Sequence, residues 1–325
     1  MRAARVLEHG PPETVTIEDV PDPVAGPGEV VVDIAYAAVN FPDVLIVANE
    51  YQVQIPAPFV PGSEFSGVVS SVGEGVDDVA VGDHAYGASF VGAFAERIVV
   101  AASSVTVIAD SVDLRDAAAF GVAHTTAYHT LRTIAEVQPG ESVLVLGAAG
   151  GVGLATVELA TILGARVVAA ASTPAKLELC RQYGAVAGIN YTTEDLKVRA
   201  KELTGGGADV VVDPVGGPYS EQALRATRWG SRFVVIGFAS GEIPRIPLNL
   251  VLLKGVIVRG MEMRSIGENV PDLVARDMRE LRELFMSGQI HPHVSAVYPL
   301  VETPQALQSM LDRTATGKVL IDPSQ

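Results

Sequence analysis

The stretch Gly140-Glu-Ser-Val-Leu-Val-Leu-Gly147-Ala-Ala-Gly150-Gly151-Val-Gly153 decides the fold, because it joins a short apolar strand to a helix through closely spaced glycines. Glycine permits the tight turn and lets backbone N–H groups approach a pyrophosphate at the N-terminus of the helix. The spacing Gly147-x-x-Gly150-x-x-Gly153 departs from the strict G-x-G-x-x-G pattern, and glycines also serve plain strand–helix packing. Because the turn opens the first βαβ unit of a strand-rich region, we interpret it as a nucleotide-binding turn.

Short apolar runs recur after this turn and predict a parallel sheet covered by helices on both faces. These runs are residues 143–146, 167–170, 210–212, 233–236 and 256–258. Before residue 122 the sequence pattern is different: strand-like runs such as 30–36 and 65–72 are bounded by Gly and Pro. That pattern is typical of a small β-barrel domain, and β-like runs return after Gln289 at 296–298 and 319–321.

Composition excludes several classes of protein. With 325 residues, 48% apolar and 19% charged, the chain is long enough for two folded domains and is not a disordered chain. The formal net charge of -15 disfavours nucleic acid as a partner. The single cysteine, Cys180, excludes an internal disulfide framework, and its place in a helix expected at 176–183 favours a packing role.

The N-terminal residues lack the apolar core of a signal peptide, and no run of about 18 apolar residues is present. From the sequence we therefore expect a cytoplasmic protein that does not bind a membrane.

Further motifs accompany the glycine turn in order along nearly the whole chain. They are Asn40-Phe-Pro-Asp43, Pro61-Gly-Ser-Glu64, Thr126-Ala-Tyr128, Asp209-Val-Val-Val-Asp213-Pro-Val-Gly-Gly217 and Gly317-Lys-Val-Leu-Ile321. With them the chain resembles the zinc-independent NADPH:quinone oxidoreductases, the ζ-crystallin-like branch of the medium-chain dehydrogenase/reductase superfamily. The signature of that branch places a Gln in the helix after the turn, whereas this chain has Glu158.

The resemblance implies an α/β fold in which a doubly wound Rossmann sheet, residues 123–289, is inserted into a GroES-like β-barrel domain, residues 1–122 and 290–325. The cofactor would lie in the cleft between the two. The implied function is an NADPH-dependent reductase that transfers hydride to a quinone or similar conjugated acceptor. The implied assembly is a homodimer paired through the edge strand near Val256–Gly260.

Two other functions remain open at this point. The same scaffold serves enoyl or 2-alkenal reductases, which reduce an activated C=C bond, and the sequence does not separate them from quinone reductases. A non-catalytic NADPH-binding protein like the lens crystallins is the third possibility. RNA binding, a side activity in the wider family, is disfavoured by the charge of -15.

The chain lacks the residues that hold catalytic zinc in related alcohol dehydrogenases. Asn40 and Ser63 stand where those enzymes have a Cys and the His of Gly-His-Glu, and neither is a suitable zinc ligand. His124 and His129 are five apart on an expected helix and do not share a face, and we interpret the His-Pro-His at 291–293 as solvated surface. We expect no zinc, which disfavours alcohol oxidation and favours acceptors whose product anion is delocalised.

Asn40 and Tyr51 are the candidate catalytic residues, because the resemblance puts their segment on the wall of the cleft that faces the nicotinamide. Asn40 could donate a hydrogen bond to the acceptor oxygen, and Tyr51 could stack on a quinone ring or donate its hydroxyl. The plainer alternatives are a turn residue for Asn40 and a core-edge residue for Tyr51.

Candidate cofactor-binding residues follow the strands of the expected sheet. By resemblance Thr126 meets the nicotinamide amide, with a helix-start residue as its alternative, while Phe238 and Met261 follow parallel strands, beyond whose carboxyl ends ligands bind. The remaining candidates line the glycine turn or follow the next two strands: Ala149, Gly150, Gly151, Val152, Ser172, Lys176 and Tyr191.

The end of the second strand predicts NADPH as the cofactor rather than NADH. NAD-binding Rossmann domains usually place an Asp or Glu there, which binds the ribose 2′-hydroxyl. This chain has no carboxylate between Glu158 and Glu178, and it offers Ser172, Thr173 and Lys176 instead. Hydroxyls and a cation suit a 2′-phosphate, and the resemblance adds the hydroxyl of Tyr191. A cap by Thr173 with Lys176 in solvent is the plainer alternative.

Overall fold

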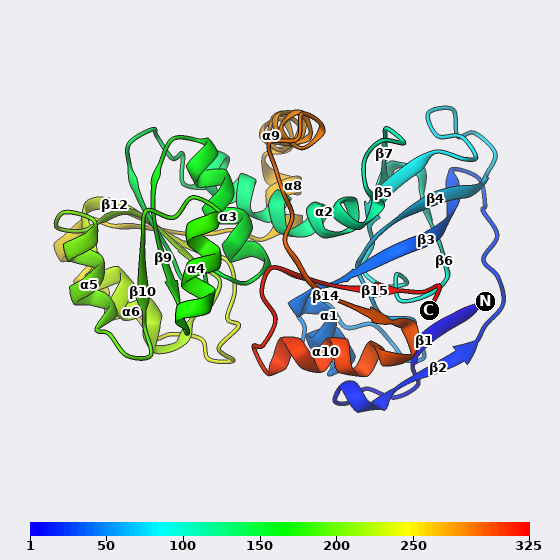
Figure 1. Cartoon of the computed structure of the whole chain (residues 1–325), viewed down its shortest axis with the longest axis horizontal. Helices are drawn as coiled ribbons and strands as arrows, with labels where there is room; N and C mark the ends of the chain where they lie inside the picture. The colour runs from blue at the N-terminus through cyan, green and yellow to red at the C-terminus, as the bar shows by residue number, and fades with distance from the viewer. The chain divides into compact units, whose positions relative to one another are not determined.

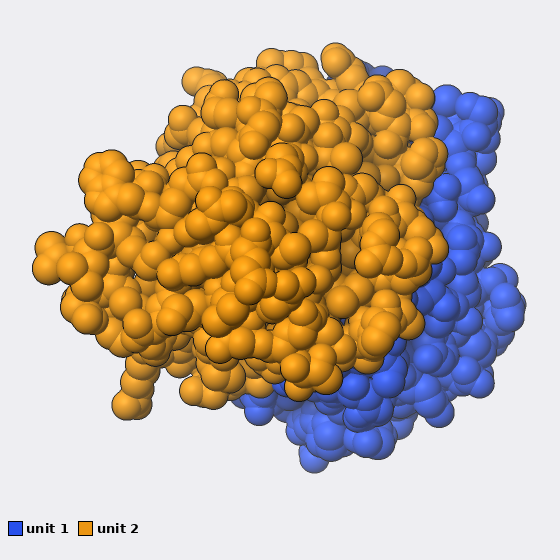
Figure 2. Space-filling model, turned by 60° about the vertical axis from the view of Figure 1, so that its left-hand side comes forward, with its two compact units in different colours: residues 1–122, 292–325 blue, residues 123–291 orange.

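The computed structural model describes residues 1–325 and divides the chain into two compact units. Unit 1 comprises residues 1–122 and 292–325, and unit 2 comprises residues 123–291 (Figure 2). The division falls inside a long helix, α2 (Leu114–His129), which continues into a short π-helix, η3 (Thr130–Ile134). No helix of the chain combines the length and the apolar character needed to cross a membrane.

Unit 1 is built on a seven-stranded sheet in the order β14-β15-β3-β4-β5-β7, with β6 also pairing with β3 (Figure 1). Its strands are β3 (Glu29–Val39), β4 (Glu64–Val72), β5 (His84–Ala88), β6 (Arg97–Ala101), β7 (Val105–Ile108), β14 (Val294–Pro299) and β15 (Lys318–Asp322). Most neighbours are antiparallel, and only β14 and β15 run parallel. Val, Ile and Phe side chains from both parts of the unit fill one core, in which Phe65 and Phe94 are fully buried.

Smaller elements close unit 1. A separate two-stranded sheet pairs β1 (Arg2–Val6) with β2 (Val15–Asp19). The helices are η1 (Pro12–Thr14), α1 (Phe41–Val47), η2 (Ala102–Ser104), η4 (Leu300–Glu302) and α10 (Thr303–Leu311).

Unit 2 contains a six-stranded, fully parallel sheet in the order β10-β9-β8-β11-β12-β13. This is the doubly wound order 3-2-1-4-5-6, and it agrees with the parallel sheet expected from the apolar runs. The strands are β8 (Ser142–Val145), β9 (Arg166–Ala171), β10 (Ala187–Asn190), β11 (Ala208–Asp213), β12 (Thr227–Val235) and β13 (Ile257–Gly260). Every residue of β8 is buried, as expected for a central strand covered on both faces.

Helices follow the strands of unit 2 as its sequence predicts. They are α3 (Gly151–Ile162), α4 (Pro174–Gln182), α5 (Leu196–Leu203), α6 (Gly217–Arg225), α7 (Leu248–Lys254), α8 (Met263–Asn269) and α9 (Pro271–Met286). Because all six strands point the same way, their carboxyl ends lie along one edge of the sheet, where a doubly wound fold binds its ligand.

Candidate functional site

The glycine turn lies between β8 and α3 at the carboxyl edge of the sheet. Gly147 adopts a positive φ of 55°, which favours glycine, and the N–H of Gly150 donates to its carbonyl oxygen over 3.0 Å. A β-carbon on Gly153 would lie 2.2 Å from the same oxygen, so only glycine allows this close approach of helix and turn.

The N-terminus of α3 is formed by Gly151, Val152 and Gly153, and it has neither a side-chain cap nor an acidic residue in its first turn. Its first N–H groups are therefore left for another acceptor. Ala149 is buried beneath the turn, and Gly150 and Gly151 are partly exposed above it. A turn with only small side chains, followed by a helix N-terminus without a side-chain cap, is suited to a pyrophosphate.

The ends of β9 and β10 bring Ser172 and Tyr191 together. Ala171, the last residue of β9, is paired with Asn190, the last residue of β10, and the N–H of Tyr191 donates to the carbonyl of Ala171 over 3.2 Å. The hydroxyl of Thr192 donates to the carbonyl oxygen of Ser172 over 3.2 Å. The parallel register thus brings the ends of the two strands next to each other, and the role of the Ser172 and Tyr191 hydroxyls toward a phosphate stays a prediction.

Lys176 lies in the first turn of α4. Its N–H donates to the hydroxyl of Thr173 over 3.3 Å, so the cap considered as the plainer alternative is present. The first turn of α4 contains no acidic residue. The side chain of Lys176 is half-buried, and its role toward a cofactor stays a prediction.

Two further candidates follow the strands on the other half of the sheet. Phe238 comes after β12 and packs on the loop after β11, because a β-carbon on Gly216 would lie 2.9 Å from its ring. Met261 follows β13, is 5% exposed, and its N–H donates to Val235 over 2.9 Å. Thr126 lies in the interior of α2 rather than at a helix start, so that alternative is wrong.

In unit 1, Asn40 belongs to a buried network of charged and polar groups. The ammonium of Lys318 donates to the amide oxygen of Asn40 over 2.5 Å and to Oε2 of Glu64 over 2.9 Å. The amide nitrogen of Asn40 donates to the same Glu64 oxygen over 3.0 Å and lies 3.4 Å from the hydroxyl of Ser63. The side chains of Lys318 and Glu64 are 5% and 1% exposed.

This network determines which way the Asn40 amide points. Its oxygen must face the ammonium group, because an ammonium only donates hydrogen bonds, so the NH2 group faces Glu64 and Ser63. The other oxygen of Glu64 accepts from the N–H of Val122 over 2.6 Å. Removing one partner of such a pair leaves an uncompensated buried charge, at a cost of about 3–5 kcal/mol.

Asp43 lies next to this network on helix α1. Its Oδ2 accepts from the N–H of Asn40 over 2.8 Å, whereas its buried Oδ1 has no hydrogen-bond partner. Burial raises the pKa of Asp43 to about 7, against the opposing effects of the Ser63 hydroxyl, the Asn40 N–H and the Lys318 charge. Glu64 adds to the rise through like-charge repulsion.

Tyr51 is half-buried and packs against the core of unit 1. Its plainer interpretation, a residue at the edge of the core, therefore agrees with the structure, and its role toward an acceptor stays a prediction.

Sequence reasoning missed Glu64, Lys318 and Asp43 as members of the site. All three belong to motifs that carried the family resemblance, yet nothing in the sequence places residues 43, 64 and 318 side by side. One signal was present, because Lys318 begins a strand with three apolar residues directly after it, and a lysine buried there needs a partner.

The histidines considered as metal ligands have partners of their own. His124 lies 3.2 Å from Oε2 of Glu158, whose other oxygen accepts from the N–H of His291 over 2.8 Å. His129 lies 2.9 Å from Asp277. No group of three or more His, Cys, Asp or Glu side chains in residues 1–325 is placed to hold a metal ion.

Two other sequence expectations have different outcomes. His293 is half-buried, where burial lowers its pKa, so the interpretation of 291–293 as solvated surface is correct for His291 and wrong for His293. Burial also raises the pKa of the Cys180 thiol to about 12, in agreement with the expected packing role.

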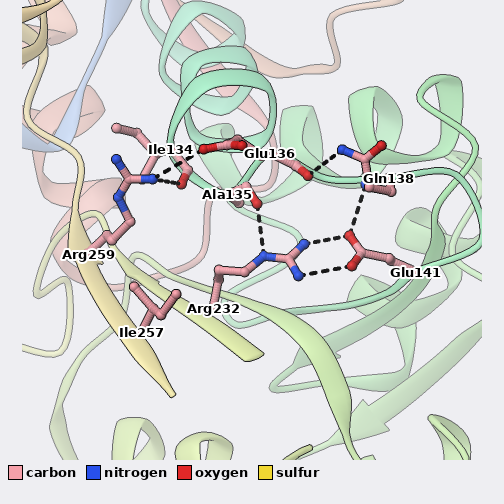
Figure 3. Close-up of a pocket in the computed structure, with 8 residues that line it drawn as sticks. All are labelled: Ile134, Ala135, Glu136, Gln138, Glu141, Arg232, Ile257 and Arg259. Carbon is pink, nitrogen blue, oxygen red and sulfur yellow. Dashed lines mark hydrogen bonds and ion pairs between the residues drawn. The ribbon is translucent and has the colours of Figure 1, made fainter. Parts of the chain in front are cut away.

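A separate pocket of about 360 Å³ lies in unit 2 (Figure 3). Its two arginines are already paired, as the dashed lines in Figure 3 show. Arg232 contacts both carboxylate oxygens of Glu141 and the carbonyl of Ala135, and Arg259 donates to the carbonyl of Ile134. Arg232 is paired with Ile257, the first residue of β13, so the pocket is at the opposite end of the strands from the glycine turn.

Two family models match the chain. One, described as zinc-binding dehydrogenase, covers residues 151–280, and the other, the alcohol dehydrogenase GroES-like domain, covers residues 26–110. The chain is also 38% identical over 311 residues to quinone oxidoreductase-like protein 2 of Rattus norvegicus, covering 95% of this chain and 89% of the rat protein. The protein belongs to the quinone oxidoreductase-like family of the medium-chain dehydrogenase/reductase superfamily.

Solved structures of similar proteins agree with this family. Mycobacterial Rv1454c complexed with NADPH matches with a TM-score of 0.92 at 31% identity, covering 99% of this chain and 100% of that one. Escherichia coli quinone oxidoreductase complexed with NADPH matches with a TM-score of 0.91 at 28% identity and the same coverage. The expected combination of a Rossmann sheet with a GroES-like domain is thereby confirmed.

The geometry of the glycine turn leads to a prediction about stability. Gly153→Ala should lower the melting temperature of the cofactor-free oxidoreductase, because its β-carbon would lie 2.2 Å from the Gly147 oxygen. Gly150→Ala is the matched control, since its β-carbon would lie 3.4 Å from the same oxygen at an ordinary φ of -77°. We expect a cost of about 1–3 kcal/mol for the first and under about 1 kcal/mol for the second. Equal melting temperatures for the two variants would contradict this account.

Proposed function

We propose that this protein is an NADPH-dependent reductase that transfers hydride to a quinone or similar conjugated acceptor without a metal ion. The observation that carries the proposal is the contact of 2.5 Å between the Lys318 ammonium and the Asn40 amide oxygen. By resemblance, Asn40 stands where alcohol dehydrogenases have a zinc-binding cysteine. Its only ligand atom is occupied by a cation, which would repel a second one.

An enzyme without a Lewis acid at this position favours acceptors whose reduced form needs little stabilisation of its negative charge. Quinones and enones delocalise the negative charge that hydride brings, whereas an alkoxide requires strong stabilisation. Bound NADPH would supply the hydride. The orientation of the Asn40 amide is held by Lys318 and Glu64, and its second N–H, whose nitrogen lies 3.4 Å from the Ser63 hydroxyl, is the proposed hydrogen-bond donor toward the acceptor oxygen. Tyr51 remains the candidate for stacking on the acceptor ring.

The acceptor class can be tested with purified protein. NADPH oxidation is followed with a benzoquinone, an unsaturated aldehyde and an enoyl-CoA at matched concentrations. We expect the benzoquinone to be reduced with the highest kcat/KM. Activity with the enoyl-CoA alone would favour the enoyl reductase alternative. NADPH binding without oxidation by any acceptor would favour a crystallin-like binding protein.

Preference for NADPH over NADH is supported by the end of β9. Ser172, Lys176 and Tyr191 offer two hydroxyls and a cation there, and α4 has no acid in its first turn. A cation in the first turn opposes the helix dipole, and a bound 2′-phosphate would offset this cost. Because the net charge is -15, a dianionic phosphate also needs local positive charge to bind.

Lys176→Ala should weaken NADPH binding roughly 10- to 100-fold while leaving NADH nearly unchanged, since a charge-assisted contact contributes about 1.5–3 kcal/mol. Dissociation constants for both cofactors measured by calorimetry test this. Lys197→Ala, which removes an exposed cation from helix α5, is the control and should alter neither constant. Equal affinities of the unmutated protein for the two cofactors, or an equal loss for both in Lys176→Ala, would refute the assignment.

We also propose a homodimer formed through β13. This strand pairs only with β12, and all four of its residues are exposed, including Ile257 and Val258. Large apolar side chains are exposed on the two elements that precede β13, with Leu252 81% and Leu253 70% exposed on α7 and Trp229 79% exposed on β12. An unpaired apolar edge strand is a ready surface for a second copy, which would extend the sheet across a two-fold axis.

Val258→Lys should convert a species of twice the 33.9 kDa chain mass into a monomer, because it brings two like charges together at the two-fold axis. Analytical ultracentrifugation at micromolar concentration measures the mass. Val198→Lys on helix α5 is the control, since Val198 is an equally exposed valine away from this edge. A monomeric unmutated protein would exclude the dimer.

A further inference from the structure

Two aromatic side chains of unit 2 meet at the carboxyl edge of the parallel sheet. Tyr191 directly follows β10, and Tyr219 lies in the first turn of α6, the helix that follows β11. The centroids of their rings lie 4.4 Å apart, and the ring planes are tilted by 43°. Both side chains are half-buried and pack against the same core cluster. The contact therefore joins the end of an edge strand to a helix that follows a more central strand.

The backbone of Tyr191 is fixed beside the end of β9. Its N–H donates to the carbonyl oxygen of Ala171 over 3.2 Å, and the hydroxyl of the next residue, Thr192, donates to the carbonyl oxygen of Ser172. In a doubly wound sheet the end of the second strand is where the group at the ribose 2′ position binds. Under the proposed function, Tyr191 is thus anchored at the place where NADPH and NADH differ.

A hydrogen bond at the backbone does not determine where a tyrosine hydroxyl points. The ring can still occupy different rotamers, and the hydroxyl moves with it. Packing against a neighbouring group restricts these rotamers and costs less when that neighbour is itself held in place. The contact with the ring of Tyr219 therefore limits the directions that the Tyr191 hydroxyl can take.

Tyr219 is held in place by the start of its own helix. Asp213, the last residue of β11, is 1% exposed and accepts hydrogen bonds from the N–H groups of Val215 and Gly216, each over 2.9 Å. The same carboxyl group accepts from the hydroxyl of Ser220, the residue after Tyr219. The first turn of α6 is thereby tied to the end of a buried strand, and the Tyr219 ring is fixed with it.

We propose that Tyr219 is a positioning residue for the choice of cofactor, which holds the ring of Tyr191 so that the Tyr191 hydroxyl faces the 2′-phosphate of NADPH. This inference rests on the proposed preference for NADPH. A hydrogen bond to a charged phosphate is stronger than one to the neutral 2′-hydroxyl of NADH. Loss of the correct orientation of Tyr191 therefore weakens NADPH binding more than NADH binding.

Dissociation constants for NADPH and NADH, measured by calorimetry, test this role. Tyr191→Phe removes the hydroxyl and keeps the ring, and it should weaken NADPH binding roughly 10-fold with little effect on NADH. Tyr219→Ala removes the second ring and should weaken NADPH binding by roughly 3- to 10-fold, again with little effect on NADH. Tyr219→Phe, which keeps the ring, should bind both cofactors like the unmutated protein.

The double variant with Tyr191→Phe and Tyr219→Ala separates positioning from packing. If Tyr219 acts through the Tyr191 hydroxyl, the double variant should bind NADPH no more weakly than Tyr191→Phe alone. Losses that multiply, or a Tyr219→Ala loss shared equally by NADPH and NADH, would overturn the proposal. Tyr298→Ala is the control and should alter neither constant, since Tyr298 is a half-buried tyrosine packed against the core of unit 1.

A pair of probes without nicotinamide distinguishes this inference from the proposed function. Adenosine 2′,5′-bisphosphate carries the 2′-phosphate, and adenosine 5′-monophosphate lacks it. The unmutated protein should bind the bisphosphate more tightly, and Tyr219→Ala should reduce the difference. Equal binding of the two probes to the unmutated protein would refute the preference for NADPH and the positioning role with it. Tighter binding of the bisphosphate that persists unchanged in Tyr219→Ala refutes the positioning role alone.

Discussion

One ammonium group, Nζ of Lys318, joins the buried polar side chains of unit 1 that we propose as part of the reaction site. It contacts Asn40 and Glu64, which are 278 and 254 residues away along the chain. The antiparallel pairing of Val319 with Val39 brings the start of β15 to the end of β3, directly before Asn40. In a buried site each charge needs a partner, and this requirement makes the arrangement of the three side chains nearly unique.

The same charge bears on the proposal that the reaction needs no metal ion, because the resemblance places Asn40 and Ser63 where related dehydrogenases have zinc ligands. A cation is already present at the amide oxygen, supplied by the protein itself, and it orients the amide instead of polarising a substrate. Two carboxyl groups, Glu64 and Asp43, share this region with one ammonium group. Burial, with a smaller effect from the Glu64 charge, raises the pKa of Asp43 to about 7. The same cluster therefore contains a buried ion pair, Lys318 with Glu64, and next to it a carboxyl group, Asp43, whose pKa is raised.

The glycine turn of unit 2, between β8 and α3, depends on close backbone packing and not on paired charges. It depends on missing side chains, because Gly153 approaches Gly147 more closely than any β-carbon allows. The first turn of α3 has no side-chain cap and no acidic residue, so its backbone N–H groups are the ones proposed to bind a pyrophosphate. Glu158, which stands where the family signature has Gln, has two partners in this structure. One carboxylate oxygen lies 3.2 Å from His124, and the other accepts a hydrogen bond from the backbone N–H of His291.

Local sequence alone was sufficient for the parts of the protein that rest on local physics. The apolar runs predicted the parallel strands, and the glycine spacing predicted the turn between β8 and α3, because period and backbone freedom are properties of neighbouring residues. The absence of a carboxylate after β9 could be counted directly. Only the tertiary structure decided that Asp43, Glu64 and Lys318 share one buried site, that Thr126 lies inside a helix, and that His293 is half-buried. Burial and charge pairing depend on strand register between distant segments, and register cannot be read from any one of them.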